Sequence, residues 1–85
     1  MVIKTTKNFD KQYSKLTVKI KAQYKSRVAL FCMNPFVIRL RNHGLKGKYL
    51  GYRSFDMSGD VSVLFTIKDN SIVIFAFIRT HSQLY

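Results

Sequence analysis

The strongest constraint on the fold is a change of sequence pattern at Asn34-Pro35. Before this pair, apolar residues recur at helical spacing over 8–16 and 17–33. Proline disfavours helical geometry in the preceding residue, so the second helix should end here. After a basic loop, the chain becomes rich in β-branched and aromatic residues over three short segments, which predicts strands. These predicted strands are 49–55, 61–67 and 72–78.

A short stretch at 2–5 predicts one further strand ahead of the helices, and Asn8 or Asp10 can cap the first helix. A chain of 85 residues is long enough for a single domain, 1–85. The predicted order is β-α-α-β-β-β. It defines an α+β fold in which two N-terminal helices pack on one face of an antiparallel sheet.

The last two strands also predict a register. If Asp69-Asn70 form a two-residue turn, one face of the hairpin becomes wholly apolar and should meet the helices. That face would carry Val61, Val63, Phe65, Ile67, Ile72, Ile74, Ala76 and Ile78. On the opposite face, Asp60 would lie across from Arg79. A slip of one residue would exchange the two faces.

The charge balance indicates a partner. The chain has 15 Lys and Arg residues against four acidic residues, all of them Asp, and its net charge is +11. Such an excess of one sign costs self-repulsion in the folded chain and favours binding to a polyanion. Nucleic acid, an acidic protein and an anionic membrane are the candidate classes.

Other sequence features bear on the cellular compartment of the protein and on metal binding. The single cysteine, Cys32, cannot form an internal disulfide, which fits a reducing compartment, and the sequence has no Cys/His metal-binding pattern. The start MVIKTTKNFD has no apolar core of a signal peptide, and the apolar run at 72–78 is too short to span a bilayer. We therefore expect a soluble, cytoplasmic protein without a metal or cofactor.

Two histidines, His43 and His81, are the best candidates for chemistry. RNA cleavage needs a base for the 2′-OH proton, an acid for the leaving 5′-oxygen, and cations for the phosphate charge. Histidine suits the first two tasks because its pKa lies near neutrality, and arginine suits the third. A single histidine in a loop is nevertheless more often an ordinary surface residue. The sequence has no Ser-His-Asp order, P-loop, GxGxxG or HExxH pattern.

Three motifs in the C-terminal half carry a resemblance. They are HGLKGKYLGYRSF at 43–55, Gly59-Asp60 before a strand, and THSQLY at 80–85. In this order and at these spacings the motifs resemble the RelE/YafQ superfamily of toxins. The helices match that superfamily only in order, length and basic character.

The resemblance implies a microbial-ribonuclease-like fold and cleavage of mRNA, in the best-known members within the translating ribosome. It also implies neutralisation by a cognate antitoxin, which we expect to be acidic. In YafQ-like toxins the matching active-site positions are a histidine, an aspartate and a C-terminal histidine. Here they correspond to His43, Asp60 and His81, while the arginine of the GxR motif corresponds to Arg53 and the terminal aromatic residue to Tyr85.

The sequence departs from this pattern at four positions. YafQ-like toxins have a further active-site histidine where this chain has Asp56, and an aspartate where it has Ser54. Many relatives carry an arginine at the position of Ser62 and a glycine at that of Arg79. In the predicted register, Arg79 faces Asp60. Its guanidinium either replaces the missing arginine or forms a plain cross-strand ion pair.

We therefore expect a metal-independent endoribonuclease with His81 as general acid and His43 or Asp60 as base. The phosphate clamps would be Arg53 with Lys46 or Arg79. The predicted RNA-binding residues are Lys46, Lys48, Tyr52, Arg79 and Tyr85.

Two questions stay open at this point. Phe75 and Phe77 can stack on bases, form a minor core, or receive an antitoxin helix, and the last two uses are favoured. The alternative function is a non-catalytic basic module that binds RNA or the ribosome. A DNA-binding regulator is disfavoured because no helix-turn-helix pattern is visible.

Overall fold

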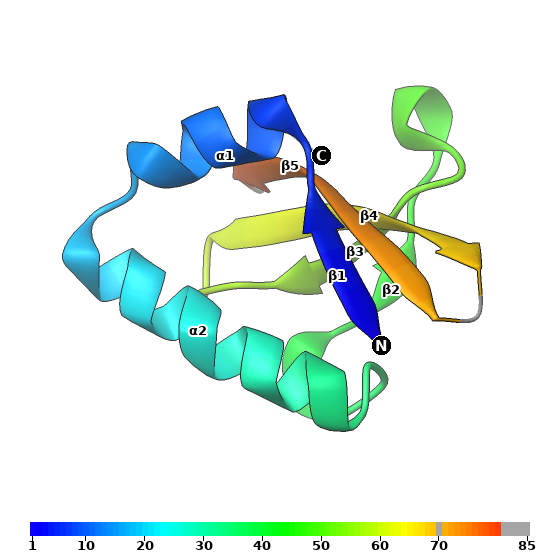
Figure 1. Cartoon of the computed structure of the whole chain (residues 1–85), viewed down its shortest axis with the longest axis horizontal. Helices are drawn as coiled ribbons and strands as arrows, with labels where there is room; N and C mark the ends of the chain where they lie inside the picture. Colours follow the sequence, from blue (N-terminus) through cyan, green and yellow to red (C-terminus); the bar gives the residue numbers. More distant parts are fainter. Residues whose placement is uncertain (70, 81–85) are drawn as a thin grey trace.

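The computed structural model describes residues 1–69 and 71–80. Within this part of the chain, two helices pack on a five-stranded mixed sheet (Figure 1). The sheet order is β1-β5-β4-β3-β2, and β1 runs parallel to β5 while the other pairs are antiparallel. The elements are β1 (Val2–Thr5), α1 (Lys7–Ser14), α2 (Val18–Met33), β2 (His43–Gly44), β3 (Arg53–Asp56), β4 (Val61–Asp69) and β5 (Ile72–Thr80), with 3-10 turns η1 (Ile38–Leu40) and η2 (Gly47–Tyr49). The expected α+β fold is confirmed, with the difference that β1 makes the sheet mixed where an antiparallel sheet was predicted.

Threonine side chains set the starts of both helices. The hydroxyl of Thr6 accepts a hydrogen bond from the Phe9 amide at 3.1 Å, and Thr17 accepts from the Ile20 amide at 3.2 Å. Each cap contributes about 1 kcal/mol to its helix. The expected cap at Asn8 or Asp10 is wrong because α1 begins at Lys7. The second helix ends at Met33, ahead of Pro35, as the sequence predicted.

A β-bulge divides the hairpin of β4 and β5. Leu64 lies opposite Phe77, but Phe65 lies opposite Phe75, so Ala76 is an extra residue on β5. Asp69 pairs with Ile72 and thus belongs to β4 rather than to a turn. The predicted pairing of the two strands is therefore wrong.

A second irregularity in the pairing, between Ile67 and Asp69 beside the turn, changes which side chains reach the core. Phe75 is fully buried against the helices, whereas Ile74, expected in the core, lies on the other face of the sheet. Ile67 is exposed. The segment 72–78 is apolar throughout, so its pattern does not distinguish the registers. The observed register places the large Phe75 ring in the core, where aromatic burial contributes most.

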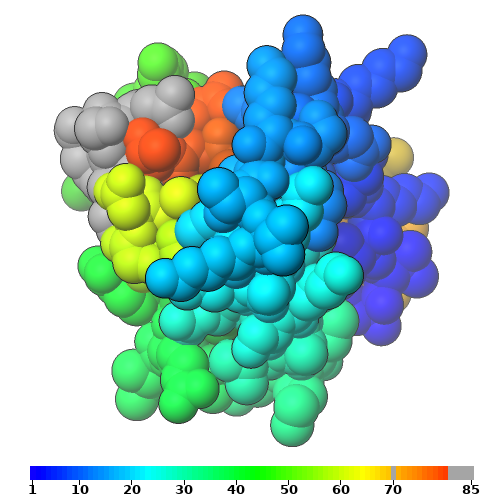
Figure 2. Space-filling view, turned by 90° about the vertical axis from the view of Figure 1, so that its left-hand side faces the viewer, coloured from blue at the N-terminus to red at the C-terminus, as the bar shows by residue number. Residues whose placement is uncertain are grey.

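The main core consists of aromatic rings between the helices and the sheet. The Phe31 ring of α2 lies 5.0 Å from Phe55, 5.1 Å from Phe65 and 5.6 Å from Phe75, measured between centroids. Phe9 of α1 lies 5.9 Å from Phe75. Figure 2 views the molecule from a side on which α1 and α2 cover much of the surface.

The segment between α2 and β3 is more ordered than a basic loop. His43–Gly44 forms a short edge strand, β2, which the sequence did not predict. The predicted strand at 49–55 shrinks to Arg53–Asp56, because η2 and a turn at Gly51, with φ +94°, occupy its first half. In the described ranges 1–69 and 71–80, no helix is both long and apolar enough to cross a membrane.

Candidate functional site

The sheet face turned away from the helices carries a row of polar residues. Asp56 of β3 lies opposite Ser62 of β4, and Ser62 lies opposite Arg79 of β5. In the adjacent row, His43 of β2 lies opposite Ser54. Residues directly opposed in an antiparallel pair share a face, so four strands contribute polar side chains to one surface.

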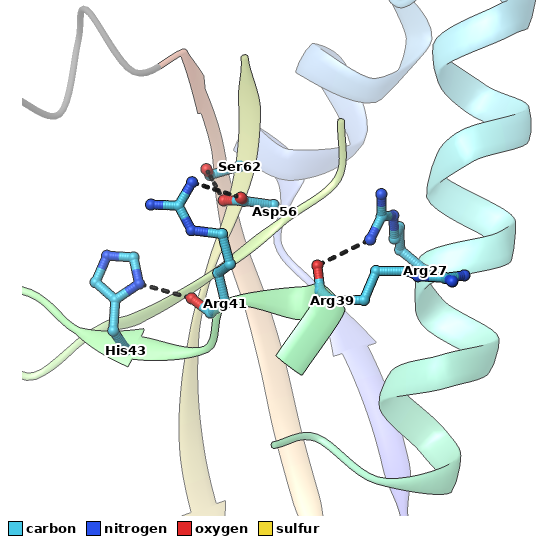
Figure 3. Close-up of polar contacts among 6 residues, drawn as sticks. All are labelled: Arg27, Arg39, Arg41, His43, Asp56 and Ser62. Carbon is cyan, nitrogen blue, oxygen red and sulfur yellow. Dashed lines mark hydrogen bonds and ion pairs between the residues drawn. The ribbon is translucent and has the colours of Figure 1, made fainter. Parts of the chain in front are cut away.

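The carboxylate of Asp56 is buried and contacts the side chains of Arg41 and Ser62 (Figure 3). The Arg41 guanidinium lies 3.4 Å from its Oδ2, and the Ser62 hydroxyl donates to its Oδ1 at 3.3 Å. The Arg41 side chain is 67% exposed, whereas that of Asp56 is 10% exposed. A buried carboxylate needs such partners, because leaving a charge uncompensated in the interior costs several kcal/mol.

His43 is held by the backbone of the same arginine. Its Nδ1 lies 2.7 Å from the carbonyl oxygen of Arg41, and its side chain is half-buried. Figure 3 shows the His43 ring and the Arg41–Asp56 pair on the same side of the sheet. Arg41 therefore links a histidine and a carboxylate that belong to different strands.

A second cluster surrounds Arg79. Its Nε donates to the Tyr49 hydroxyl at 3.2 Å, and its guanidinium carbon lies 4.7 Å from the centre of the Phe77 ring. The Phe77 ring lies 5.7 Å from that of Tyr52. The hydrogen bond from Arg79 lowers the pKa of Tyr49, since it stabilises the phenolate. Lys48 also lies over the Tyr49 ring, at 5.2 Å. The cluster combines cations with aromatic faces.

A small second core supports this face. Leu45 and Leu64 are buried outside the main aromatic cluster, and Leu64 lies opposite Phe77. The Leu45 amide donates to the Tyr52 carbonyl at 3.0 Å. Phe77 thus takes part in a minor core, one of the expected alternatives, whereas Phe75 belongs to the main core.

Arg53 lies on the other face of the sheet. It is opposed by Phe65, whose ring belongs to the core beneath the helices. The Arg53 Nε donates to the Asn42 side-chain oxygen at 2.7 Å, and the guanidinium lies 5.7 Å from the Phe36 ring. The structure therefore does not bring Arg53 together with Asp56.

The remaining predicted residues lie at the rim or outside the described part. Asp60 is exposed in the turn before β4, and Ser62, not Asp60, lies opposite Arg79, because the hairpin is shifted by two residues there. The expected Asp60–Arg79 pairing is wrong. Lys46 and Lys48 are exposed around η2. His81 and Tyr85 lie outside the described residues.

Sequence reasoning did not single out Arg41 or the pairing of Tyr49 with Arg79. Asp56 stood out only as a departure from a motif. The strand alternation of Ser54 and Asp56 against Phe55 was the available signal that Asp56 belongs to the polar face. Among the described residues, no three His, Cys, Asp or Glu side chains gather in a way that would hold a metal ion.

Comparison with known proteins places the chain in a class of toxins. The chain matches, over residues 1–85, the family described as the bacterial toxin of a type II toxin-antitoxin system, YafQ. The chain belongs to this YafQ toxin family, and the resemblance inferred from the motifs is confirmed. No curated protein matches the chain.

Solved structures of toxins share the fold. The structure of YafQ from E. coli strain BL21(DE3) matches with a TM-score of 0.76 and 21% identity, covering 99% of this chain and 97% of that one. A YoeB/ParE toxin from Agrobacterium tumefaciens matches with a TM-score of 0.77 and 15% identity, covering 95% and 99%. The E. coli DinJ-YafQ complex matches with a TM-score of 0.67 and 18% identity, covering 99% and 97%.

Proposed function

We propose that this toxin is an endoribonuclease that cleaves mRNA, on the translating ribosome in the cytoplasm, and that an acidic antitoxin neutralises it. The observation that carries the proposal is the open face of the sheet. This face carries His43, the Arg41–Asp56 pair and Arg79, which lie on the strands or on the loop beside them. Tyr49 and Tyr52 lie near Arg79 and can contact RNA bases. Membership of the YafQ family and the net charge of +11 support it.

The proposed reaction is attack by the RNA 2′-OH on the adjacent phosphorus. A base, His43 or Asp60, takes the proton of the 2′-OH, and the bond from phosphorus to the 5′-oxygen breaks. His81 gives a proton to that oxygen, leaving a 2′,3′-cyclic phosphate and a 5′-OH end. No metal takes part in this proposed route.

Cations must stabilise the charge that develops on the phosphate oxygens. Arg79 is the better placed of the two predicted arginines, because its cluster lies on the same face as His43 and Asp56. Arg53 is stacked on Phe36 and bonded to Asn42, contacts that also support a structural contribution. Lys46 and Lys48 would attract the RNA backbone from the rim.

The test is product mapping on programmed ribosomes and on free RNA, with a chelator added only to the free RNA because ribosomes need Mg²⁺. We expect cleavage with 2′,3′-cyclic phosphate ends that the chelator does not reduce. A matched control is Lys19→Ala, which removes an exposed charge from α2 without touching the open face. Loss of cleavage with the chelator would contradict the metal-independent route.

The antitoxin proposal rests on the charge of the toxin and on the relative solved as a DinJ-YafQ complex. We expect co-expression of the acidic partner to restore growth. Complex formation should slow at high salt, where electrostatic steering is screened. Toxicity that no acidic partner relieves would contradict this part of the proposal.

A second candidate function is RNA or ribosome binding without catalysis. The cluster of Tyr49, Tyr52, Phe77 and Arg79 favours it, because aromatic rings and a guanidinium bind single strands without any chemistry. Strong, salt-dependent RNA binding by a parent protein that yields no cleavage products would favour this candidate over the enzyme.

A further inference from the structure

Arg41 has an unusual backbone conformation. Its φ of 53° and ψ of 45° place it in the left-handed region, and it is the one non-glycine residue with positive φ in 1–69 and 71–80. Such a conformation is costly for a residue with a side chain, so neighbouring contacts must hold it there. Its amide donates to the Ile38 carbonyl at 3.0 Å, the preceding Leu40 is fully buried, and Arg27 donates to the Arg39 carbonyl at 2.9 Å.

In this conformation the backbone carbonyl and the side chain of Arg41 contact two different groups. The carbonyl oxygen lies 2.7 Å from His43 Nδ1, and the guanidinium lies 3.4 Å from Asp56 Oδ2 (Figure 3). A carbonyl oxygen can only accept a hydrogen bond, so His43 Nδ1 must carry the hydrogen in this contact. In the neutral ring, Nε2 is then the nitrogen with a lone pair, as a general base requires.

The exposure of the pair differs sharply between the partners. Asp56 is almost buried, whereas two thirds of the Arg41 side chain is open to solvent, at 67%. A guanidinium has five N–H donors in a planar fork, so a contact with one carboxylate oxygen leaves donors that can bind a phosphate. Arg41 is therefore a cation held by a buried carboxylate at the edge of the site and presented to solvent.

We propose that Arg41 is a positioning residue for His43 and an additional phosphate contact of the same site. Its carbonyl oxygen fixes the imidazole with Nδ1 protonated, and its guanidinium, oriented by Asp56, binds an RNA phosphate. The inference rests on the proposed function for the use that it assigns to His43. The two contacts themselves can be tested without any cleavage.

The first test is nitrogen NMR of the imidazoles of the whole protein at about pH 8.5, where imidazoles are generally neutral. Two-bond proton–nitrogen correlations distinguish the two tautomers, and comparison with His43→Gln assigns the signals. We expect His43 to carry its hydrogen on Nδ1, both in the parent and in Arg41→Gly. Glycine adopts positive φ freely and keeps the carbonyl. A parent His43 with the hydrogen on Nε2 would overturn the positioning role.

The second test is the salt dependence of binding to a 2′-O-methyl oligonucleotide, which cannot be cleaved through its 2′-oxygen. Arg41→Gly should lower the slope of log K against log salt by about 0.7, the loss of one phosphate contact with a single strand. Arg41→Lys should restore the slope, because it restores the charge. An unchanged slope in Arg41→Gly, with Lys19→Ala as the control, would overturn the phosphate contact.

Cleavage assays then separate this inference from the proposed function. If the parent cleaves RNA, Arg41→Gly should raise KM more than it lowers kcat, since the backbone contact to His43 survives. If the parent does not cleave RNA while the tautomer and the slope behave as expected, the enzymatic proposal fails and the two roles of Arg41 stand. The reverse result, cleavage without either signature, removes Arg41 from the site.

Discussion

The two faces of the sheet carry opposite chemistry although the same strands build both. In β3, Phe55 packs beneath α2 while its neighbour Asp56 joins a polar row on the other side. The helix side is a close-packed apolar core that includes the aromatic rings, and the open side carries cations, hydroxyls and one buried carboxylate around the small apolar group of Leu45, Leu64 and Phe77. Because the packed face fixes the backbone of the strands, the polar side chains on the other face also start from fixed positions. Stability and chemistry are thus separable by face, and the following substitutions test that separation.

The largest expected effect is on the helix side. Phe31→Ala should lower the free energy of unfolding by about 3–5 kcal/mol, because it removes a fully buried ring that contacts three others. A domain this small has a thin margin, so the variant should be largely unfolded. Urea titration followed by circular dichroism measures the change. Leu50→Ala, at an exposed position, is the control, and an equal loss in both would contradict the assignment of the core.

The next largest effect belongs to the proposed acid. His81→Ala should reduce cleavage by about 10²–10⁴-fold, the usual contribution of a general acid or base. The melting temperature and RNA affinity should stay near those of the parent if the two kinds of role separate. The assay is product mapping on programmed ribosomes. Full activity in this variant would remove His81 from the proposed mechanism.

A smaller effect is expected from the basic rim. Replacing Lys46 and Lys48 with Ala should weaken binding to all RNA sequences alike and lower the salt slope by about 0.7 for each lost phosphate contact. The matched control replaces Lys19 and Lys25, exposed charges on α2, with Ala. Equal changes in the two double variants would mean that RNA does not prefer the open face.

The smallest expected effect is on the titration of two tyrosines, one on each side of the sheet. Burial raises the pKa of Tyr24, beside Phe75, to about 12, whereas the hydrogen bond from Arg79 lowers the pKa of Tyr49. Ultraviolet titration should lose its late component in Tyr24→Phe and its early component in Tyr49→Phe. Because the folded-state pKa of Tyr24 lies above the ordinary 10.0, its contribution to stability is complete below pH 10 and is lost toward pH 12. A parent whose tyrosines all titrate together would contradict the contrast.

Local patterns were enough to predict both helices and the order of every strand except β2. Thr17 and Pro35 delimit α2 through a cap and a steric restriction, and both effects act within a few residues. The register of β4 and β5 was not predictable, because the apolar segment 72–78 offers an acceptable core face in more than one alignment. Packing of Phe75 against Phe31 selects one alignment, and only the folded molecule contains that contact.

The candidate site shows the same limit. The motif was enough to find His43. Its contact with the Arg41 carbonyl depends on the left-handed backbone of Arg41, which no sequence pattern predicts. The ion pair of Arg41 with Asp56 joins a loop to a strand that comes later in the sequence. The position of Arg79 depended on both register shifts in the hairpin, so that Ser62 rather than the predicted Asp60 lies opposite it. The roles of His43, Asp60, His81 and Arg53 remain predictions.

The strand order also governs when this protein can exist as a folded molecule. β5, the last described strand to be synthesised, lies between β4 and β1, and the Thr6 hydroxyl is bonded to a carbonyl 70 residues further along. Until β5 is available, β1 has no neighbour in the sheet and the long-range closure cannot begin. The open face with Arg79 on it therefore forms only after β5 has been synthesised. A growing chain that has not reached β5 lacks the finished site.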